Sequence, residues 1–351
     1  MTGSATIVIG DAVVGDGRAC YVIAEAGANH NRDFDVARRL IDVAADSGAD
    51  AVKFQTYSGR TLYSTKTPRF DYLGDLGAKP AHELLDDIAL PRDWQAPLAE
   101  HCRDRGVEFL SSPFDRQAID ELDALDVAAL KIASFELVDL GLLRHAAATG
   151  RPLILSTGMA SLAEIDEALV AARAAGASQI ALLQCASLYP SPPSIMNLRT
   201  IPAMHAAFGL PVGLSDHTAG IHVAPAAVAL GAAIIEKHFT LDRTMTGPDH
   251  PFAIEPHELK ELVAHVRDVE VALGDGLKRG PSAAEAEEMY SKARRSIVAA
   301  RAIPAGTVVT ADMLTVKRPG FGIAPKFIDA VVGRVAKVDI DDDDIVMWEM
   351  L

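Results

Sequence analysis

Cysteine is scarce in this chain, with three residues (Cys20, Cys102 and Cys185) in 351. They are too few and too scattered for a disulfide framework. No run approaches the ~18 uninterrupted apolar residues that span a bilayer. The first five residues also lack a basic region followed by an apolar segment, so no signal peptide is expected. Together these absences predict a protein of the reducing cytoplasm that does not bind membranes.

Basic residues are also in deficit. The chain has 33 lysines and arginines against 48 aspartates and glutamates, a net charge of −15. Proteins that bind nucleic acid or anionic membrane carry a basic face, so both classes of partner are excluded. An anionic substrate would require the few cations to be concentrated at its site.

Alternating strand-like and helix-like segments fill the first 274 residues. Apolar or β-branched runs recur eight times, at 21–27, 50–57, 107–112, 128–134, 152–157, 179–187, 211–218 and 233–240. Amphipathic segments separate them, for example 34–46, 92–105, 115–125, 162–175 and 225–230. Eight such units over about 250 residues predict a (β/α)₈ TIM barrel, in the α/β class. A doubly wound open sheet is less favoured because no GxGxxG turn follows the first strand.

A different pattern begins near the C-terminus. Residues 275–294 are polar and predict a linker that contains a helix. From 295 to 351, short apolar pieces are broken by prolines and glycines, which predicts a small β-rich domain. About 55 residues bury too little surface for much stability alone, so docking against the barrel or a partner chain is expected.

Polar residues are concentrated where the predicted barrel strands end. In TIM-barrel enzymes the chemistry lies at the carboxyl ends of the strands. The residues at these positions are Glu25, Lys53, Gln55, Ser111, Ser112, Lys131, Ser134, Glu136, Ser156, Thr157, Ser187, Tyr189, Ser215, Asp216, His217, Glu236, Lys237 and His238. Asp249 follows the last strand in the segment Gly247–Pro248–Asp249 and is placed to contact a polar ligand.

Two histidines, His217 and His238, close neighbouring strands and can face one point. Neutral imidazoles suit manganese, iron, cobalt or zinc better than magnesium or calcium. A pair of protein ligands leaves open positions for substrate oxygen. The residues therefore favour a divalent-metal site over two histidines that only form hydrogen bonds in the barrel mouth.

Two lysines, Lys53 and Lys131, lie inside apolar strands, where unpaired lysine is rarely buried. They either pair with carboxylates such as Glu25 and Glu136 or converge on a bound anion. The nearby serines favour the second possibility, with a phosphate and a carboxylate group as the ligands. A Schiff base on one lysine is the alternative. Because the lysines lie beside them, Glu25 and Glu136 are expected to stay ionised. They are either simple ion-pair partners of the lysines or groups that shuttle protons or stabilise positive charge.

The ordered motifs of this chain resemble the sialic acid synthase family, which makes N-acetylneuraminic, legionaminic or pseudaminic acids. The matching segments are IAEAGANHN at 23, GADAVKFQT at 48, SSPFD at 111, KIASFE at 131, ILSTGMA at 154, QCASLYPSP at 184, GLSDHT at 213, IEKHFTLDR at 235, GPDH at 247 and KRPGFG at 317. The resemblance implies a barrel followed by an antifreeze-like (SAF) domain. It also implies a homodimer in which that domain caps the partner's site.

The resemblance assigns roles residue by residue. His217 and His238 match metal ligands, usually for manganese, with magnesium or cobalt as alternatives. Lys53, Lys131, Ser134, Ser156 and Ser215 match positions that hold phosphoenolpyruvate, and Ser112 ends a strand beside them. Gln55, Tyr189 and Asp249 match the sugar site. Glu25 and Glu136 match carboxylates tied to the reaction, and Arg318 matches an arginine that reaches the neighbouring subunit's sugar.

The implied reaction condenses phosphoenolpyruvate with an open-chain N-acetylated hexosamine. N-acetylneuraminate synthesis is the first expectation, and pseudaminic or legionaminic acid synthesis is the alternative. The alternative stays open because the motifs match different branches of the family and because Ser187 stands where some N-acetylneuraminate synthases carry asparagine. Three rivals remain: a Schiff-base aldolase, a synthase for phosphorylated aldoses such as the octulosonate and heptulosonate synthases, and a carbohydrate- or ice-binding scaffold. The segment 295–351 argues against the second, and the strand-end residues argue against the third.

Overall fold

The computed structural model describes residues 5–68 and 79–351. They form two compact units, which divide between Gly274 and Asp275. Each unit has its own hydrophobic core. No helix in the described part of the chain is both long enough and apolar enough to cross a bilayer.

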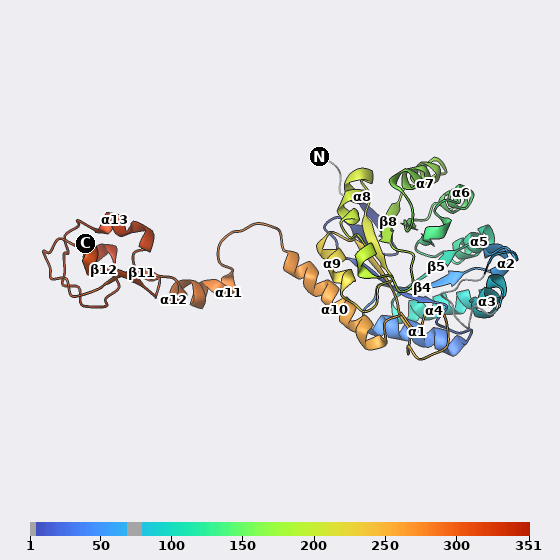
Figure 1. Ribbon diagram of the computed structural model, residues 1–351, viewed down its shortest axis with the longest axis horizontal. Coiled ribbons are helices and arrows are strands. Elements are labelled where there is room, and N and C mark those ends of the chain that lie inside the picture. Colours follow the sequence, from blue (N-terminus) through green and yellow to red (C-terminus); the bar gives the residue numbers. More distant parts are fainter. Residues whose placement is uncertain (1–4, 69–78) are drawn as a thin grey trace. The chain divides into compact units, whose positions relative to one another are not determined.

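The first unit is a parallel barrel of eight strands, as predicted (Figure 1). The strands are β3 (Tyr21–Gly27), β4 (Ala51–Thr56), β5 (Glu108–Pro113), β6 (Leu130–Ile132), β7 (Leu153–Ser156), β8 (Ile180–Cys185), β9 (Val212–Asp216) and β10 (Ile234–His238). They are hydrogen-bonded in the order β5-β4-β3-β10-β9-β8-β7-β6, so β3 pairs with both β4 and β10. β5 and β6 lie next to each other and complete the ring.

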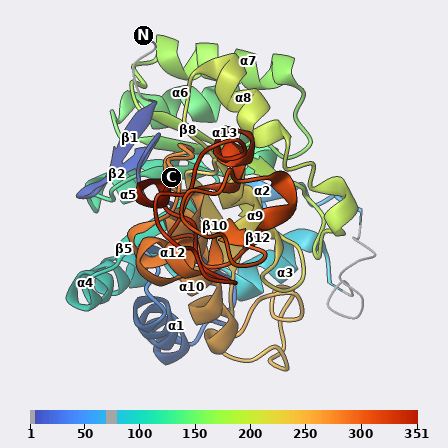
Figure 2. The same cartoon turned by 90° about the vertical axis from the view of Figure 1, so that its left-hand side faces the viewer.

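Helices surround the strands (Figures 1 and 2). They are α1 (Phe34–Asp46), α4 (Gln95–Arg105), α5 (Arg116–Ala124), α6 (Leu140–Ala148), α7 (Leu162–Ala174), α8 (Thr200–Phe208), α9 (Val223–Ala229) and α10 (Pro256–Leu273). Neighbours in the ring pack together, as α1 does with α4 and α10. Two extra helices, α2 (Gly59–Leu62) and α3 (Ala81–Ile88), stand between β4 and α4 and pack against each other.

Local sequence signals set the helix ends. Asp33 caps α1 by accepting from the backbone N–H groups of Asp35 and Val36. Ser161 and Glu164 form a reciprocal capping box at the start of α7. Gly106 ends α4 at φ +71°, a left-handed conformation that glycine adopts without a Cβ penalty.

An N-terminal hairpin, which the sequence pattern did not predict, precedes the barrel (dark blue in Figure 2). It pairs β1 (Thr6–Ile9) with β2 (Ala12–Gly15) in antiparallel register. Its Ile7, Ile9 and Val14 pack with the first residues of the barrel strands, including Tyr21 and Ile23. The hairpin therefore closes the amino-terminal end of the barrel and leaves the opposite end free for a site.

The second unit begins with short helical turns, α11 (Ala283–Glu285), Ala286–Tyr290 and α12 (Ser291–Ala293). A compact fold follows, in which β11 (Ser296–Ala299) pairs antiparallel with β12 (Leu314–Lys317), and α13 (Ile328–Val331) lies near the end. Isolated bridges such as Ile303 with Ile340 hold the remaining loops. Its core includes Ile297, Ile340 and Val346, so this small unit is β-rich, as predicted.

Closure of the barrel base makes a testable contribution to stability. Ile9 is fully buried, whereas Val8 on the same strand is 43% exposed. Ile9→Ala is expected to lower the free energy of unfolding by about 2–5 kcal/mol, because it leaves a cavity in the base. Urea denaturation of the full chain followed by circular dichroism measures this change.

Val8→Ala is the matched control and is expected to change stability by less than about 0.5 kcal/mol. Equal effects of the two substitutions would show that the hairpin does not close the barrel base.

Candidate active site

A cavity of about 640 Å³ opens at the carboxyl ends of the barrel strands. Every site residue predicted for the barrel lines it. They are Glu25, Lys53, Gln55, Ser112, Lys131, Ser134, Glu136, Ser156, Tyr189, Ser215, His217, His238 and Asp249. Arg318, the remaining predicted residue, belongs to the second unit and is exposed just after β12.

A buried charge network forms the floor of the cavity. The Lys53 ammonium lies 2.8 Å from a Glu25 carboxylate oxygen and donates to Ser112 Oγ at 3.0 Å. Both Lys53 and Lys131 lie 3.7 Å from oxygens of Glu236. Each of these charged side chains is at most 4% exposed, so the lysines are compensated by carboxylates rather than by water.

Serine hydroxyls complete this floor. Ser156 Oγ accepts from Lys131 Nζ at 2.7 Å, and Ser215 Oγ donates to Glu236 at 2.8 Å. Ser134 Oγ accepts from the backbone N–H of Gly158 at 3.0 Å. Two cations and several hydroxyl groups therefore face the same part of the cavity. This arrangement suits a phosphate or carboxylate group as a ligand.

The two carboxylates that were expected to stay ionised have raised pKa values. Burial raises the pKa of Glu25 to about 7, although the Lys53 charge opposes this shift. Burial also raises the pKa of Glu136 to about 7. The expectation was wrong because the loss of hydration outweighs the attraction of the lysines. Both groups can exchange protons near neutral pH.

The pKa of Glu236 shifts in the opposite direction. Burial disfavours its charge, but Lys131 and Lys53, together with the Ser215 hydrogen bond, lower its pKa to about 2. It is the permanent anion of the floor. Glu136, by contrast, has a buried oxygen, Oε2, with no hydrogen-bond partner among the described residues, so it is free to accept a proton from a bound molecule.

The two histidines meet at the rim, with ring centroids 5.4 Å apart. His217 Nδ1 lies 2.9 Å from the carbonyl oxygen of Ala186, so it donates there and leaves Nε2 as a lone-pair donor. His238 Nδ1 is buried without a hydrogen-bond partner in the described structure. Burial lowers the pKa of His238 well below its ordinary value, so its ring is neutral, as metal coordination requires. These residues fit a divalent metal.

Gly27 explains how the neighbouring groups come together. It adopts φ +51°, and a Cβ on it would lie 2.9 Å from Asp249 Oδ2, 3.4 Å from His238 Cε1 and 3.5 Å from Glu25 Oε1. Glycine thus leaves the room into which these three side chains converge. Asp249 Oδ2 lies 3.7 Å from His238 Nδ1.

Gln55 and Tyr189 line the polar side of the mouth. Gln55 Nε2 donates to Glu25 at 2.8 Å and orients that carboxyl group. The Tyr189 ring packs on His217, with centroids 4.3 Å apart, and on Phe252 at 5.5 Å. Tyr189 therefore fixes the position of one histidine while facing the cavity.

A polar clamp holds the loop that carries Asp249. His250 Nδ1 lies 2.6 Å from Thr240 Oγ1, and its Nε2 lies 3.2 Å from Asn31 Oδ1. Asn29 Nδ2 donates to the Phe239 carbonyl at 2.8 Å. The loop after β3 is thereby tied to the loop after β10. These positioning residues were not predicted, although the polar cluster Asn29–His30–Asn31 was visible in the sequence.

Glu236 is the main site residue to which the sequence assigned no role, although it was listed among the polar residues at the strand ends. Alternation along β10 would have found it, since residues two apart on a strand share a face. Glu236 and His238 face the cavity, whereas Lys237 between them binds Asp216 at 3.0 Å outside it. Cys185 also lines the cavity, with Sγ 3.7 Å from His217 Nδ1.

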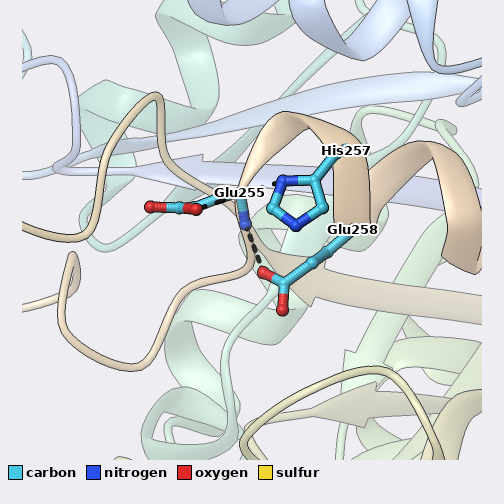
Figure 3. Close-up of side chains that lie close together, drawn as sticks. All are labelled: Glu255, His257 and Glu258. Carbon is cyan, nitrogen blue, oxygen red and sulfur yellow. Dashed lines mark hydrogen bonds and ion pairs between the residues drawn. The ribbon is translucent and has the colours of Figure 1, made fainter.

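A second group of possible metal ligands lies at the start of α10, where Glu255, His257 and Glu258 approach one another (Figure 3). Glu258 Oε2 accepts from the Glu255 backbone N–H at 2.8 Å as part of a helix cap, and it pairs with Arg243. The His257 side chain is 70% exposed. Helix capping and the ion pair account for this cluster without a metal.

Comparison with known proteins gives a consistent result. The NeuB family matches residues 40–278, and the SAF domain matches residues 294–351. The N,N'-diacetyllegionaminic acid synthase of Campylobacter jejuni is 41% identical over 329 residues, which cover 93% of this chain and 98% of that protein.

Two solved structures are similar. The N-acetylneuraminic acid synthetase of Leptospira borgpetersenii superposes with a TM-score of 0.72 at 36% identity, covering 82% of this chain and 95% of that chain. The spore coat polysaccharide biosynthesis protein SpsE of Bacillus subtilis gives 0.68 at 36% identity and covers 99% of both chains.

Removal of the Glu236 charge is expected to destabilise the barrel. Glu236→Gln leaves two buried lysines with less compensation, which is expected to cost about 3–5 kcal/mol. Because the pKa of Glu236 is lowered in the folded state, this contribution is present above the ordinary glutamate range and lost as the pH falls below it. Urea denaturation at pH 7 and at a series of pH values from the ordinary glutamate range down towards the lowered pKa of about 2 measures both effects.

Glu261→Gln, at an exposed position of α10, is the control and is expected to be neutral. A Glu236→Gln protein as stable as the control at pH 7 would contradict the charge network.

Proposed function

Because the chain belongs to the NeuB family and ends in a SAF domain, we propose that it condenses phosphoenolpyruvate with an open-chain N-acetylated hexosamine. The products are a nonulosonic acid, the class that includes sialic and legionaminic acids, and phosphate. One observation carries this proposal: two buried lysines and a histidine pair face the same cavity. The enzyme is a transferase that forms a carbon–carbon bond.

Phosphoenolpyruvate binds on the cavity floor in this scheme. Lys53 and Lys131 supply positive charge, and Ser112, Ser134, Ser156 and Ser215 supply hydroxyls. Glu236 keeps the two lysines in place, since it is near both ammonium groups. When Glu25 is protonated, the two lysines carry more positive charge than Glu236 alone neutralises, and this surplus attracts an anionic ligand.

His217 and His238 hold the divalent metal, manganese in the first instance, with magnesium or cobalt as alternatives. A metal bound there supplies a Lewis acid for the aldehyde oxygen of the sugar. Tyr189 and the Ala186 carbonyl fix the His217 ring. Gln55 and Asp249 bind sugar hydroxyl or amide groups beside it.

The bond changes are as follows. The electron pair of the enol double bond joins C3 of phosphoenolpyruvate to the aldehyde carbon, and positive charge develops at C2. Water adds to C2, the C2–O bond to phosphate breaks, and C2 becomes a ketone. The two protons of the water end on the new hydroxyl group and on phosphate. Holding both reactants in register supplies much of the rate enhancement.

The carboxylates of the chain move these protons. Glu136 accepts a proton from the attacking water through its unpartnered Oε2, for which a pKa near 7 is well matched. Glu25, held by Gln55 and Lys53, stabilises the charge at C2 when it is ionised.

We extend the proposal to a homodimer in which the second unit of one copy caps the cavity of the other. Arg318 is exposed, and its guanidinium makes no ion pair within the described parts of either unit. An arginine with this freedom can reach the sugar of a partner subunit.

A Schiff-base aldolase is the second possibility, because burial lowers the pKa of Lys131 and favours its neutral amine. Its Nζ is, however, engaged by Ser156 and near Glu236. Trapping of substrate by borohydride with activity that survives chelation would favour the aldolase over the condensation.

His217 is expected to be essential for metal binding. His217→Ala should lose tight manganese binding and reduce turnover by at least about 100-fold, since one of two protein ligands is gone. Manganese titration calorimetry and phosphate release measure the two effects.

His222→Ala is the matched control, at an exposed position shortly after His217, and should leave both unchanged. Near-normal turnover of metal-stripped His217→Ala would contradict the metal site.

Glu136 is expected to set the acid limb of the pH–rate profile. A base must be deprotonated, so the kcat of the wild type should rise as pH increases through about 7 and then level off. Glu136→Gln should remove this limb and lower kcat by about 100-fold or more.

The control is Glu167→Gln, at an exposed position of α7, which should keep the wild-type profile. A Glu136→Gln enzyme that retains the rise through pH 7 would show that another group is the base.

A further inference from the structure

A second cavity, of about 580 Å³, lies at the amino ends of the barrel strands. We refer to it as the basal cavity. Among the described residues it shares none of its lining with the candidate active site. Ile9, Asp11 and Ala12 of the N-terminal hairpin form one side. The other sides come from the start of β3 and β5, from α4 and from the segment before β6. A cavity of this size accommodates an organic molecule.

Carboxylates dominate the charge of the basal cavity. Its described lining carries four carboxylates against one guanidinium group, on Asp11, Asp50, Glu108, Asp126 and Arg103. Asp50 and Asp126 are each paired with an arginine outside the lining, at 3.1 Å and 2.8 Å. Asp11 and Glu108 form no ion pair and accept no hydrogen bond within the described part of the chain. Two carboxylates therefore face the cavity without a direct partner.

Glu108 is held at the edge between the barrel and the hairpin. It is half-buried at the first position of β5. Its carboxyl group lies so close to Gly10, in the hairpin turn, that a Cβ there would collide with Oε1. Burial and the charge of Asp11 raise the pKa of Glu108, although Arg103 opposes this shift. A carboxylate in this position is stabilised by a ligand that brings positive charge.

Tyr21 provides an observation that is independent of the acidic residues. It begins β3, lines the basal cavity and is 4% exposed. Its hydroxyl group is buried and has no hydrogen-bond partner among the described residues. Buried hydroxyl groups are normally paired, so this one indicates a partner that is not part of the chain. Burial, with the nearby charges of Glu108 and Asp50, raises the pKa of Tyr21, so the phenol is neutral and can accept a hydrogen bond.

The rest of the lining favours an organic ligand over a metal ion. Ile9, Phe109, Leu125 and Val127 contribute apolar surface to the cavity. Calcium takes six or more oxygen ligands. Within the residues that the structure describes, three potential metal ligands converge at the start of α10 and not in this cavity. A positive group attached to a carbon chain matches both the unpaired carboxylates and the apolar surface.

We propose that the basal cavity is a binding site for an aliphatic amine. The ammonium group donates to the Glu108 carboxylate and to the Tyr21 hydroxyl oxygen, and the charge of Asp11 adds to the attraction. The carbon chain packs on Phe109 and Leu125. The site is separate from the proposed condensation and does not depend on it. Because its groups come from the hairpin, β3 and β5, a bound amine joins the hairpin to the barrel.

The first test measures the binding of 1,4-diaminobutane to the full chain, by titration calorimetry and thermal unfolding at constant ionic strength. Saturable binding of about one molecule per chain and a higher Tm are expected, because the ligand binds the folded state. 1,4-Butanediol has the same chain length without charge, so it should produce neither effect. Absence of saturable diamine binding, or equal effects of the diol, would overturn the proposal.

Two conservative variants locate the site. Glu108→Gln should weaken diamine binding at least about tenfold, because the charge partner of the ammonium group is lost. Tyr21→Phe removes one hydroxyl group and should weaken binding about fivefold or more, since a hydrogen bond to a charged group is lost. Circular dichroism checks that both variants fold.

Glu261→Gln is the matched control, because it removes the same charge at an exposed position of α10. It should bind the diamine as the wild type does. Wild-type affinity in both Glu108→Gln and Tyr21→Phe, or an equal loss in Glu261→Gln, would show that the diamine binds the acidic surface in general and would overturn the site.

Calcium chloride in the same titration separates an amine site from a metal site. Calcium is expected to leave the diamine affinity unchanged at constant ionic strength. Saturable calcium binding that displaces the diamine and is lost in Glu108→Gln would assign the two carboxylates to a metal ion and overturn the proposal.

Discussion

Two lysine ammonium groups buried beside one carboxylate are the interaction on which the site depends. Lys53 and Lys131 would be costly to bury alone. Glu236 lies 3.7 Å from each and keeps a pKa far below the ordinary value because both lysines favour its charge. The network concentrates two of the chain's few cations in one cavity, although the net charge of the chain is −15.

The barrel places this network and the histidine pair in one cavity. Alternation along β9 and β10 sends Ser215, His217, Glu236 and His238 inward, while Asp216 and Lys237 pair outside. Gly27 leaves the room in which Asp249, His238 and Glu25 converge. The N-terminal hairpin closes the other end of the barrel. The lysine pair, the histidine pair and the carboxyl group of Glu136 thus line one cavity.

Much of this arrangement could be predicted from the sequence. The eight strands, helix α1 and the convergence of strand-end residues follow from periodicity and from the position of polar residues in a barrel. The raised pKa values of Glu25 and Glu136 could not, because burial depends on tertiary packing that local sequence does not reveal. Glu236 was listed at the end of its strand but was given no role, although strand alternation places it on the same face as His238.

Other features depend on distant contacts. The hairpin residues Ile7 and Ile9 resemble any short apolar run until they pack under the barrel. The leucines of α3 have ordinary helical spacing, and their facing toward the cavity appears only in the fold. The role proposed for Arg318 involves a second copy of the chain, so the structure of one copy does not bear on it.

The most direct test of the account follows one oxygen atom. Phosphoenolpyruvate labelled with ¹⁸O at the oxygen between C2 and phosphorus is incubated with the manganese-loaded protein and a sugar that it accepts. The masses of the released phosphate and of the nine-carbon product are then measured. The proposed attack of water at C2 predicts that the label appears in phosphate. Label in the sugar product, or product formed without release of phosphate, would contradict the condensation proposed for this cavity.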